Sequence, residues 1–223
     1  MTLKRLLGIG GLTATLTAIL FLSSGHLDWP MAWVYVSART AIATASMYAI
    51  ASKAPQLLKE RFRPGKDAKA WDRPLVTVTM LFWPAILIAI GLDIRFGWSS
   101  EPTLAIRLVA LMVSLLGDAF SKWAAASNKF YSRVIRIQRD REHTVVSEGP
   151  YRYVRHPGYA GALATALTTP IALGSWWALF PSGLMGLLLV FRTVLEDKTL
   201  HNELSGYAEY AEHTRYRLLP GIW

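Results

Sequence analysis

The sequence predicts an all-α protein, a multi-pass integral membrane bundle of about six transmembrane helices with both termini in the cytoplasm. Three observations lead to this fold. The chain of 223 residues is 52% hydrophobic but only 17% charged, whereas soluble domains carry about 25% charged residues. Its apolar residues gather into six runs, and most of its Lys and Arg residues lie between alternate runs. A spanning helix needs about 20 mainly apolar residues, which this pattern provides.

The six apolar runs are expected to form the spans. They cover residues 6–23, 30–51, 75–92, 104–125, 158–173 and 177–194. A signal peptide would resemble the first run, but no clear small-x-small cleavage site precedes His26, so a span is favoured. Pro30 suits the first turn of the second helix. Residues 196–210 are expected to continue the last span as a cytoplasmic helix.

We expect one integrated domain, in which residues 1–127 hold the first four spans and residues 128–223 form the cofactor-binding region.

The orientation of the bundle in the membrane follows from the basic residues. The second connection contains Lys53, Lys59, Arg61, Arg63, Lys66, Lys69 and Arg73, and the fourth contains Lys129, Arg133, Arg136, Arg139, Arg141, Arg152 and Arg155. Because cytoplasmic loops carry the excess of Lys and Arg, both connections are placed in the cytoplasm.

The net charge of +9 comes largely from these loops, so it indicates contact with membrane lipids rather than with nucleic acid. The chain has no cysteine, which excludes disulfides and thiolate metal sites. Its five histidines are not paired at zinc-binding spacing, so no metal is expected.

Two charged residues, Arg39 and Asp118, fall inside expected spans. Charged groups at membrane depth are costly and usually have a partner. The expected depths of these two residues differ by only a few ångströms, so we predict that they pair with each other. Lys122, one helical turn beyond Asp118, is a second partner that the spacing allows.

The densest polar motif is residues 148–161, which read Glu-Gly-Pro-Tyr-Arg-Tyr-Val-Arg-His-Pro-Gly-Tyr-Ala-Gly. Gly149 and Pro150 signal a turn, and Pro157 suits the start of the fifth helix. A helix start presents free N–H groups that would hold a carboxylate or phosphate. A simpler explanation is that the arginines bind lipid headgroups and the tyrosines belong to an interfacial belt.

Two further motifs lie near the C-terminus. Arg192 and Glu196 are four residues apart and share a helix face, so they either form a simple ion pair or bind substrate, with one of them accepting a proton. Gly206-Tyr207-x-x-Tyr210, with the tail at residues 215–221, either covers a cytoplasmic pocket or lies on the membrane as an amphipathic segment.

Together these motifs resemble the membrane methyltransferases of the isoprenylcysteine carboxyl methyltransferase family and its bacterial relatives, over residues 128–223. Arg192-x-x-x-Glu196-Asp197 resembles the Arg-x-x-x-Glu-Glu pattern of that family, with Asp197 at the position of the second Glu. The resemblance implies that S-adenosylmethionine binds at the cytoplasmic ends of the last spans. It implies cofactor contacts from Gly149, Pro150, Tyr151, Arg155, His156, Tyr159, Gly161, Asp197 and Tyr207, and catalytic roles for Arg192 and Glu196 in orienting the acceptor.

The expected activity is therefore methyl transfer to a lipophilic or lipidated acceptor, such as an isoprenylcysteine-like carboxylate. A phospholipid amine and a small isoprenoid stay open as acceptors. One alternative is a membrane NADPH-dependent reductase of the sterol reductase type, because those enzymes have a similar His-Pro-x-Tyr-x-Gly segment. Another is a non-enzymatic transporter or scaffold, although the sequence shows no inverted repeat.

Overall fold

The computed structural model describes residues 3–53 and 67–223, except for the side chains of residues 3–9 and of Lys53. Every regular element in this part of the chain is helical, which confirms the all-α prediction. The α-helices are α1 (Leu3–Ser24), α2 (Pro30–Lys53), α4 (Asp72–Phe96), α5 (Leu104–Ser127), α6 (Pro157–Leu173), α7 (Leu179–Glu203) and α8 (Tyr207–His213), with 3-10 turns η1 (Arg139–Arg141) and η2 (Gly149–Arg152). Four residues of the predicted basic connection, Lys59, Arg61, Arg63 and Lys66, lie outside the described residues.

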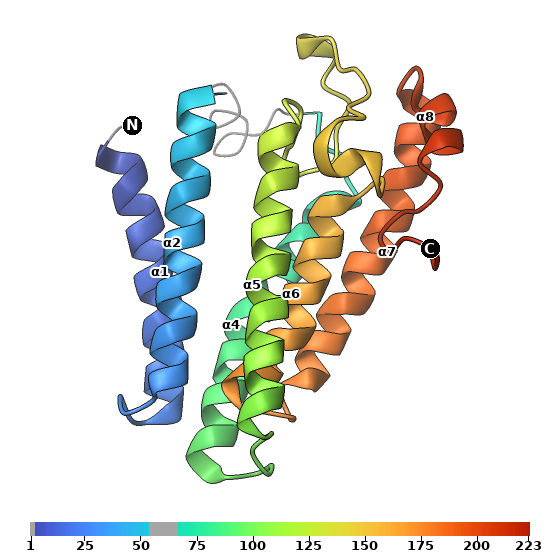
Figure 1. The fold of residues 1–223 in the computed structure, drawn as a ribbon. Helices are drawn as coiled ribbons and strands as arrows, with labels where there is room; N and C mark the ends of the chain where they lie inside the picture. Colours follow the sequence, from blue (N-terminus) through green and yellow to red (C-terminus); the bar gives the residue numbers. More distant parts are fainter. Residues whose placement is uncertain (1–2, 54–66) are drawn as a thin grey trace.

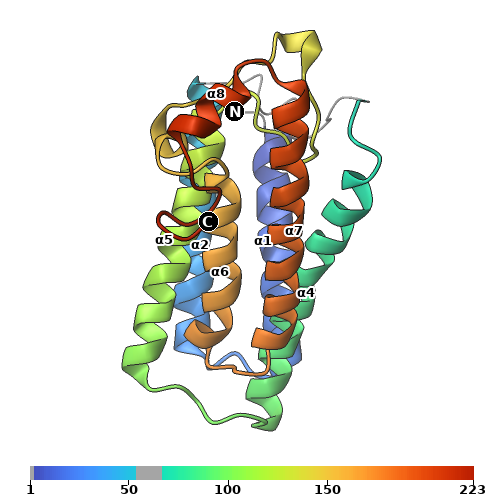
Figure 2. The same cartoon turned by 90° about the vertical axis from the view of Figure 1, so that its right-hand side faces the viewer.

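In the described part of the chain, six long helices form an elongated bundle in which helices that follow one another run in opposite directions (Figures 1 and 2). The connections at residues 25–29, 97–103 and 174–178 lie at one end of this bundle. The start of α1, the long segment between α5 and α6, and α8 lie at the other end. The motif residues therefore gather at one end of the molecule.

The composition of the helices supports a membrane protein. Among the described residues, α4, α5 and α7 are long and apolar enough to cross a bilayer, with mean hydropathies of 2.3, 1.8 and 1.5. Large apolar side chains such as Leu81, Leu116 and Leu187 are exposed on their outer faces. Outward-facing apolar surface of this kind suits contact with lipid. The count of six spans stays a prediction.

The start of α6 is fixed by close contact with α5. A Cβ atom on Gly161 would lie 2.3 Å from the carbonyl oxygen of Gly117, so only glycine fits at this crossing. The Ser121 hydroxyl donates to the Gly158 carbonyl oxygen (2.8 Å), one helical turn earlier in α6. Small residues and side-chain hydrogen bonds are the usual means by which membrane helices approach each other.

The predicted pairing of Arg39 with Asp118 is confirmed. Arg39 in α2 lies 3.2 Å from Asp118 in α5, and Lys122 lies 3.4 Å from the same carboxylate oxygen. Arg39 also donates to the Tyr35 hydroxyl (2.7 Å) and lies 4.9 Å from the centre of the Trp83 ring in α4. This cluster connects α2, α4 and α5.

The prediction of one helix through residues 196–210 is wrong near its end. Helix α7 continues without a break to Glu203, and a separate helix begins at Tyr207. Gly206 takes a left-handed backbone conformation (φ 81°), which ends helical continuation. The change of direction brings Tyr207 and Tyr210 to the end of the bundle that carries the other motifs.

Candidate active site

A cavity of about 480 Å³ lies at the motif-bearing end of the bundle, and it is bounded by α4, α5, α6, α7, α8 and the segment between α5 and α6. This volume is in the range of small-molecule and cofactor sites. Seven predicted site residues line the cavity: Tyr151, Arg155, His156, Tyr159, Arg192, Glu196 and Tyr207. The structure thus brings together residues from the turn before α6 and from the end of α7.

The other four predicted residues are not part of the cavity lining. Gly149 has a left-handed conformation (φ 59°), and a Cβ atom there would lie 2.9 Å from the Ser127 hydroxyl. Pro150 is buried in the same turn, and Gly161 lies in the contact with α5. These three residues shape the backbone that carries the lining side chains. Asp197 is buried behind the cavity wall.

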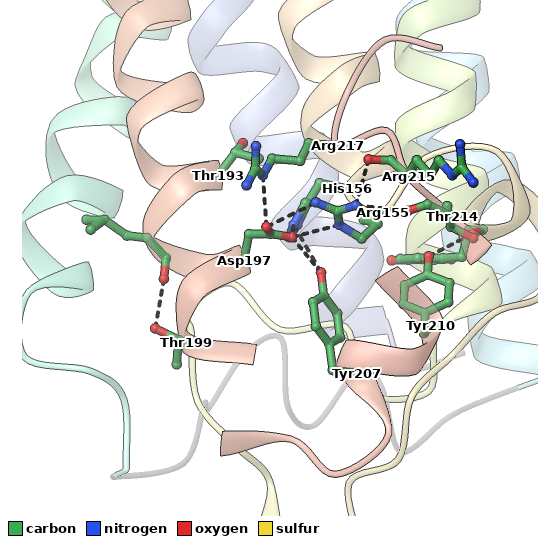
Figure 3. Close-up of polar contacts among 12 residues, drawn as sticks. Arg155, His156, Thr193, Asp197, Thr199, Tyr207, Tyr210, Thr214, Arg215 and Arg217 are labelled. Carbon is green, nitrogen blue, oxygen red and sulfur yellow. Dashed lines mark hydrogen bonds and ion pairs between the residues drawn. The ribbon is translucent and has the colours of Figure 1, made fainter. Parts of the chain in front are cut away.

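Asp197 holds several lining side chains in place (Figure 3). Its carboxylate is 2% exposed. One oxygen accepts hydrogen bonds from Arg155 (2.8 Å) and Tyr207 (2.9 Å) and lies 3.1 Å from His156 Nε2. The other oxygen accepts from Arg155 (3.1 Å) and Arg217 (2.8 Å). Asp197 therefore organises residues from the turn before α6, from α8 and from the C-terminal tail.

The C-terminal tail is bonded to the start of α6. The backbone N–H groups of Arg155 and His156 donate to the carbonyl oxygens of Tyr216 and Arg217, each at 2.9 Å. The Arg155 guanidinium also donates to the carbonyl oxygens of Thr214 and Arg215. Burial acts to lower the pKa of Arg155, but its hydrogen bonds with Asp197 outweigh this and raise the pKa, so this cation stays charged.

Arg192 has a partner that the sequence did not reveal. It donates two hydrogen bonds to Asp72 at the start of α4 (2.7 and 3.1 Å) and a third to the Arg133 carbonyl oxygen (2.8 Å). Asp72 is fully buried and also accepts from the Ile135 N–H (2.7 Å). No ion pair between Arg192 and Glu196 is found among the described residues. Only the position of Asp72 before an apolar run could have signalled its role, and that position is common at helix starts.

Glu196 has an unsatisfied oxygen in the cavity wall. Its Oε2 atom is buried and has no hydrogen-bond partner within the described residues. The Tyr159 side chain interacts with Glu196 and also lies 5.3 Å below the Arg192 guanidinium. A buried carboxylate oxygen without a partner is costly. The site is therefore prepared to receive a hydrogen-bond donor from a bound molecule.

The segment between α5 and α6 forms a roof over the cavity, with Phe130, His143 and Val145 in its lining. Its middle, residues 134–138, is not helical, and Ile135 is buried there. Burial, followed by the charges of Arg136 and Arg141, lowers the pKa of His143 to about 4. His143 is therefore neutral at physiological pH.

This neutral histidine predicts a pH dependence of stability. An unfolded histidine titrates near pH 6.5, so between about pH 6.5 and pH 4 the unfolded chain binds a proton that the folded chain does not. Stability should therefore fall as the pH is lowered through this window. We expect the melting temperature of the wild type in detergent to fall more steeply between about pH 7 and pH 5 than that of His143→Phe. The exposed His213→Phe variant serves as the control, and equal slopes in all three proteins would contradict the prediction.

Comparison with known proteins identifies a relationship for the C-terminal half. Residues 108–202 match the model of the isoprenylcysteine carboxyl methyltransferase family. The chain is 31% identical over 147 residues to a protein-S-isoprenylcysteine O-methyltransferase of Schizosaccharomyces pombe, covering 65% of this chain and 56% of that protein. It is 33% identical over 69 residues to a probable protein-S-isoprenylcysteine O-methyltransferase of Oryza sativa subsp. indica, covering 30% of this chain and 36% of that protein.

The chain thus spans between about a third and just over half the length of these curated relatives. The region matched by the family model includes the turn before α6 and most of α7. These matches confirm the resemblance predicted from the sequence motifs. They do not favour the reductase alternative.

Proposed function

We propose, from the match of residues 108–202 to the isoprenylcysteine carboxyl methyltransferase family, that this chain is an integral membrane methyltransferase. It transfers a methyl group from S-adenosylmethionine to a lipophilic acceptor. One observation carries the proposal: the turn before α6 and the end of α7 line a single cavity of cofactor size. The two motifs that carry the resemblance thus form one site.

The residues present fit S-adenosylmethionine, which supplies a methyl group on a sulfonium sulfur when bound. Tyr151, Tyr159 and Tyr207 line the cavity, and aromatic faces attract cations. Gly158, in the first turn of α6, also lines it, where N–H groups of a helix start suit a carboxylate. His156 is held by Asp197, so its ring orientation is fixed before binding.

In this proposal Arg192 and Glu196 orient the acceptor. Asp72 holds one edge of the Arg192 guanidinium, and Nη1 makes no hydrogen bond with the described residues. This nitrogen can pair with an acceptor carboxylate, while Glu196 Oε2 accepts a neighbouring N–H. A carboxylate is already ionised at neutral pH, so no general base is required. Catalysis then consists of alignment and the exclusion of water.

The acceptor reaches this site from the bilayer. Val76, Thr79, Met80 and Trp83 line the cavity at helical spacings of three and four, so the cavity extends along one face of α4. Met80 is 56% exposed, which supports an opening beside this candidate span. An isoprenylcysteine-like carboxylate suits such a route because its lipid chain stays in the membrane.

We also propose that all six long helices cross the membrane and that the site and both termini face the cytoplasm. The basic residues Lys129, Arg133, Arg139 and Arg141 belong to the segment between α5 and α6 that lines the cavity. Such residues are enriched on the cytoplasmic side and can contact anionic lipid headgroups. An Arg139→Cys variant tests this orientation, because a membrane-impermeant thiol reagent can be added to either side of sealed vesicles. Labelling of residue 139 only from the outside of right-side-out vesicles would contradict the proposal.

His156→Ala should weaken binding of S-adenosylhomocysteine about tenfold or more, because it removes a lining ring and leaves Asp197 with one fewer partner. Calorimetry with the full chain in detergent measures the affinity. His213→Ala is the matched control, because His213 is exposed on α8. Unchanged affinity in His156→Ala would remove this residue from the site. NADPH binding in place of S-adenosylhomocysteine would favour the reductase.

The identity of the methyl acceptor can be tested with labelled methionine. Cells with and without the gene are fed this methionine, and their lipids and membrane proteins are analysed by mass spectrometry. A labelled methyl ester on a lipidated cysteine supports the proposed acceptor. A label on a phospholipid amine would identify the phospholipid as the acceptor instead. The absence of any gene-dependent label would contradict the proposed activity.

A further inference from the structure

The roof of the cavity contains a histidine that lies outside all of the motifs. His143 is in the segment between η1 and η2 and lines the cavity. Its ring packs against Phe130, with ring centroids 4.3 Å apart and planes inclined by 39°. Phe130 is itself buried and is flanked by the cations of Lys129 and Arg141. The His143 ring therefore has a fixed support.

A backbone hydrogen bond determines which ring nitrogen of His143 carries the proton. The Gln138 N–H donates to Nδ1 (3.3 Å), so Nδ1 is unprotonated. A neutral imidazole then carries its proton on Nε2. Gln138 is held in turn, because its side chain donates to the Phe130 carbonyl oxygen and accepts from Arg141. Nε2 has no partner in the described ranges, 3–53 and 67–223, so it is a donor ready for a bound molecule.

The cavity that His143 lines also has an apolar end. Val145, Leu200 and Leu204 line the same cavity, and they belong to a hydrophobic cluster with Tyr207 and Tyr210. Leu200 follows Glu196 by four residues, so this apolar end lies about 6 Å along α7 from the polar end. An apolar wall together with a neutral hydrogen-bond donor suits a nitrogen heterocycle. A carboxylate would prefer charged donors.

We propose that His143 binds the adenine ring of the methyl donor by donating a hydrogen bond from Nε2 to one ring nitrogen. This inference rests on the proposed function and adds a binding residue outside the motif at residues 148–161. It places the heterocycle at the apolar end of the cavity. The reacting groups then lie toward Glu196 and Arg192.

The test compares S-adenosylhomocysteine with its 1-deaza, 3-deaza and 7-deaza analogues, by calorimetry on the full chain in detergent. In the wild type one analogue should bind about fivefold to tenfold more weakly than the parent compound, which is the usual effect of one lost hydrogen bond. In His143→Phe the parent compound should be weakened by a similar factor, and that analogue should show no further loss. Equal losses for every analogue in both proteins would overturn the inference. The inference would also be overturned if substitution of His143 changed the effect of removing the carboxylate of S-adenosylhomocysteine, and not the effect of removing a ring nitrogen.

Two further variants separate ligand binding from a purely structural role. His143→Gln places an amide N–H near the position of Nε2 but loses the acceptor for Gln138, whereas His143→Asn retains an acceptor near Nδ1 and loses the outer donor. If His143 binds the ligand, His143→Gln should retain most of the affinity for S-adenosylhomocysteine. His143→Asn should bind it about fivefold to tenfold more weakly. The reverse order would assign His143 to support of the roof alone.

Failure of this inference can be distinguished from failure of the proposed function. If the wild type does not bind S-adenosylhomocysteine, both are overturned. If it binds this compound but shows no coupling between residue 143 and any ring nitrogen, only the role of His143 is overturned.

Discussion

Asp197→Asn is expected to lower the melting temperature by about 10 °C and to abolish detectable binding of S-adenosylhomocysteine. The substitution preserves size but removes the charge that neutralises two arginines, Arg155 and Arg217. Breaking a buried ion pair by removing one partner costs about 3–5 kcal/mol, because the remaining charge stays buried without compensation. The same change releases His156 and Tyr207, which line the cavity. Thermal unfolding in detergent and calorimetry measure the two effects.

Glu203→Gln is the matched control for this experiment. Glu203 pairs with Lys69, and both side chains are about one-third exposed. Such a pair contributes about 1 kcal/mol at most, so the melting temperature should change by no more than about 3 °C. Asp197→Glu keeps the charge but adds a methylene group in a closed site, and an intermediate effect is expected. A stable Asp197→Asn protein with normal affinity would show that the network does not support the site.

Glu196→Gln is expected to lower turnover about 100-fold while changing the affinity for S-adenosylhomocysteine by less than about threefold. The variant keeps the size of the side chain and removes a hydrogen-bond-accepting oxygen, Oε2, that has no partner in the described part of the chain. If this oxygen orients the substrate that receives the methyl group, its loss misaligns the attacking nucleophile, and small misplacements reduce rates strongly. Methylation of a synthetic isoprenylcysteine carboxylate under single-turnover conditions measures the effect, and calorimetry measures the affinity.

The exposed Glu209→Gln variant is the control, because Glu209 lies in the first turn of α8 outside the cavity lining. A loss of affinity as large as the loss of turnover would assign Glu196 to the cofactor instead of the acceptor. Full turnover would remove Glu196 from the reaction.

The helices and the gathering of the motif residues at one end of the bundle could be predicted because their signals are local. Runs of apolar residues indicate helices at membrane lengths, and Pro157 marks the start of α6. The pairing of Arg39 with Asp118 followed from the cost of burying charge in a membrane. The motif residues were expected near one another because two successive helices bring them to the same end of the bundle.

The partners of the motif residues could not be predicted, because they come from distant parts of the chain. Asp72 and Arg192 are 120 residues apart, and no periodicity or spacing connects them. Arg217 lies in a tail that the sequence allowed either over a pocket or on the membrane. The roof residue His143 lies in an irregular segment without a motif, so only the folded chain shows that it lines the cavity.

The contact between Asp72 and Arg192 has a consequence for any attempt to transplant the proposed site into another protein. The region that matches the family begins at residue 108, so Asp72 lies before it, and Arg217 lies after it. A hybrid protein that grafts residues 108–202 onto foreign helices would lose a counter-ion for the guanidinium on one side and an anchor for Asp197 on the other. The unit of exchange is therefore the described bundle with its tail, and modular swapping succeeds only where the host supplies a carboxylate at the position of Asp72.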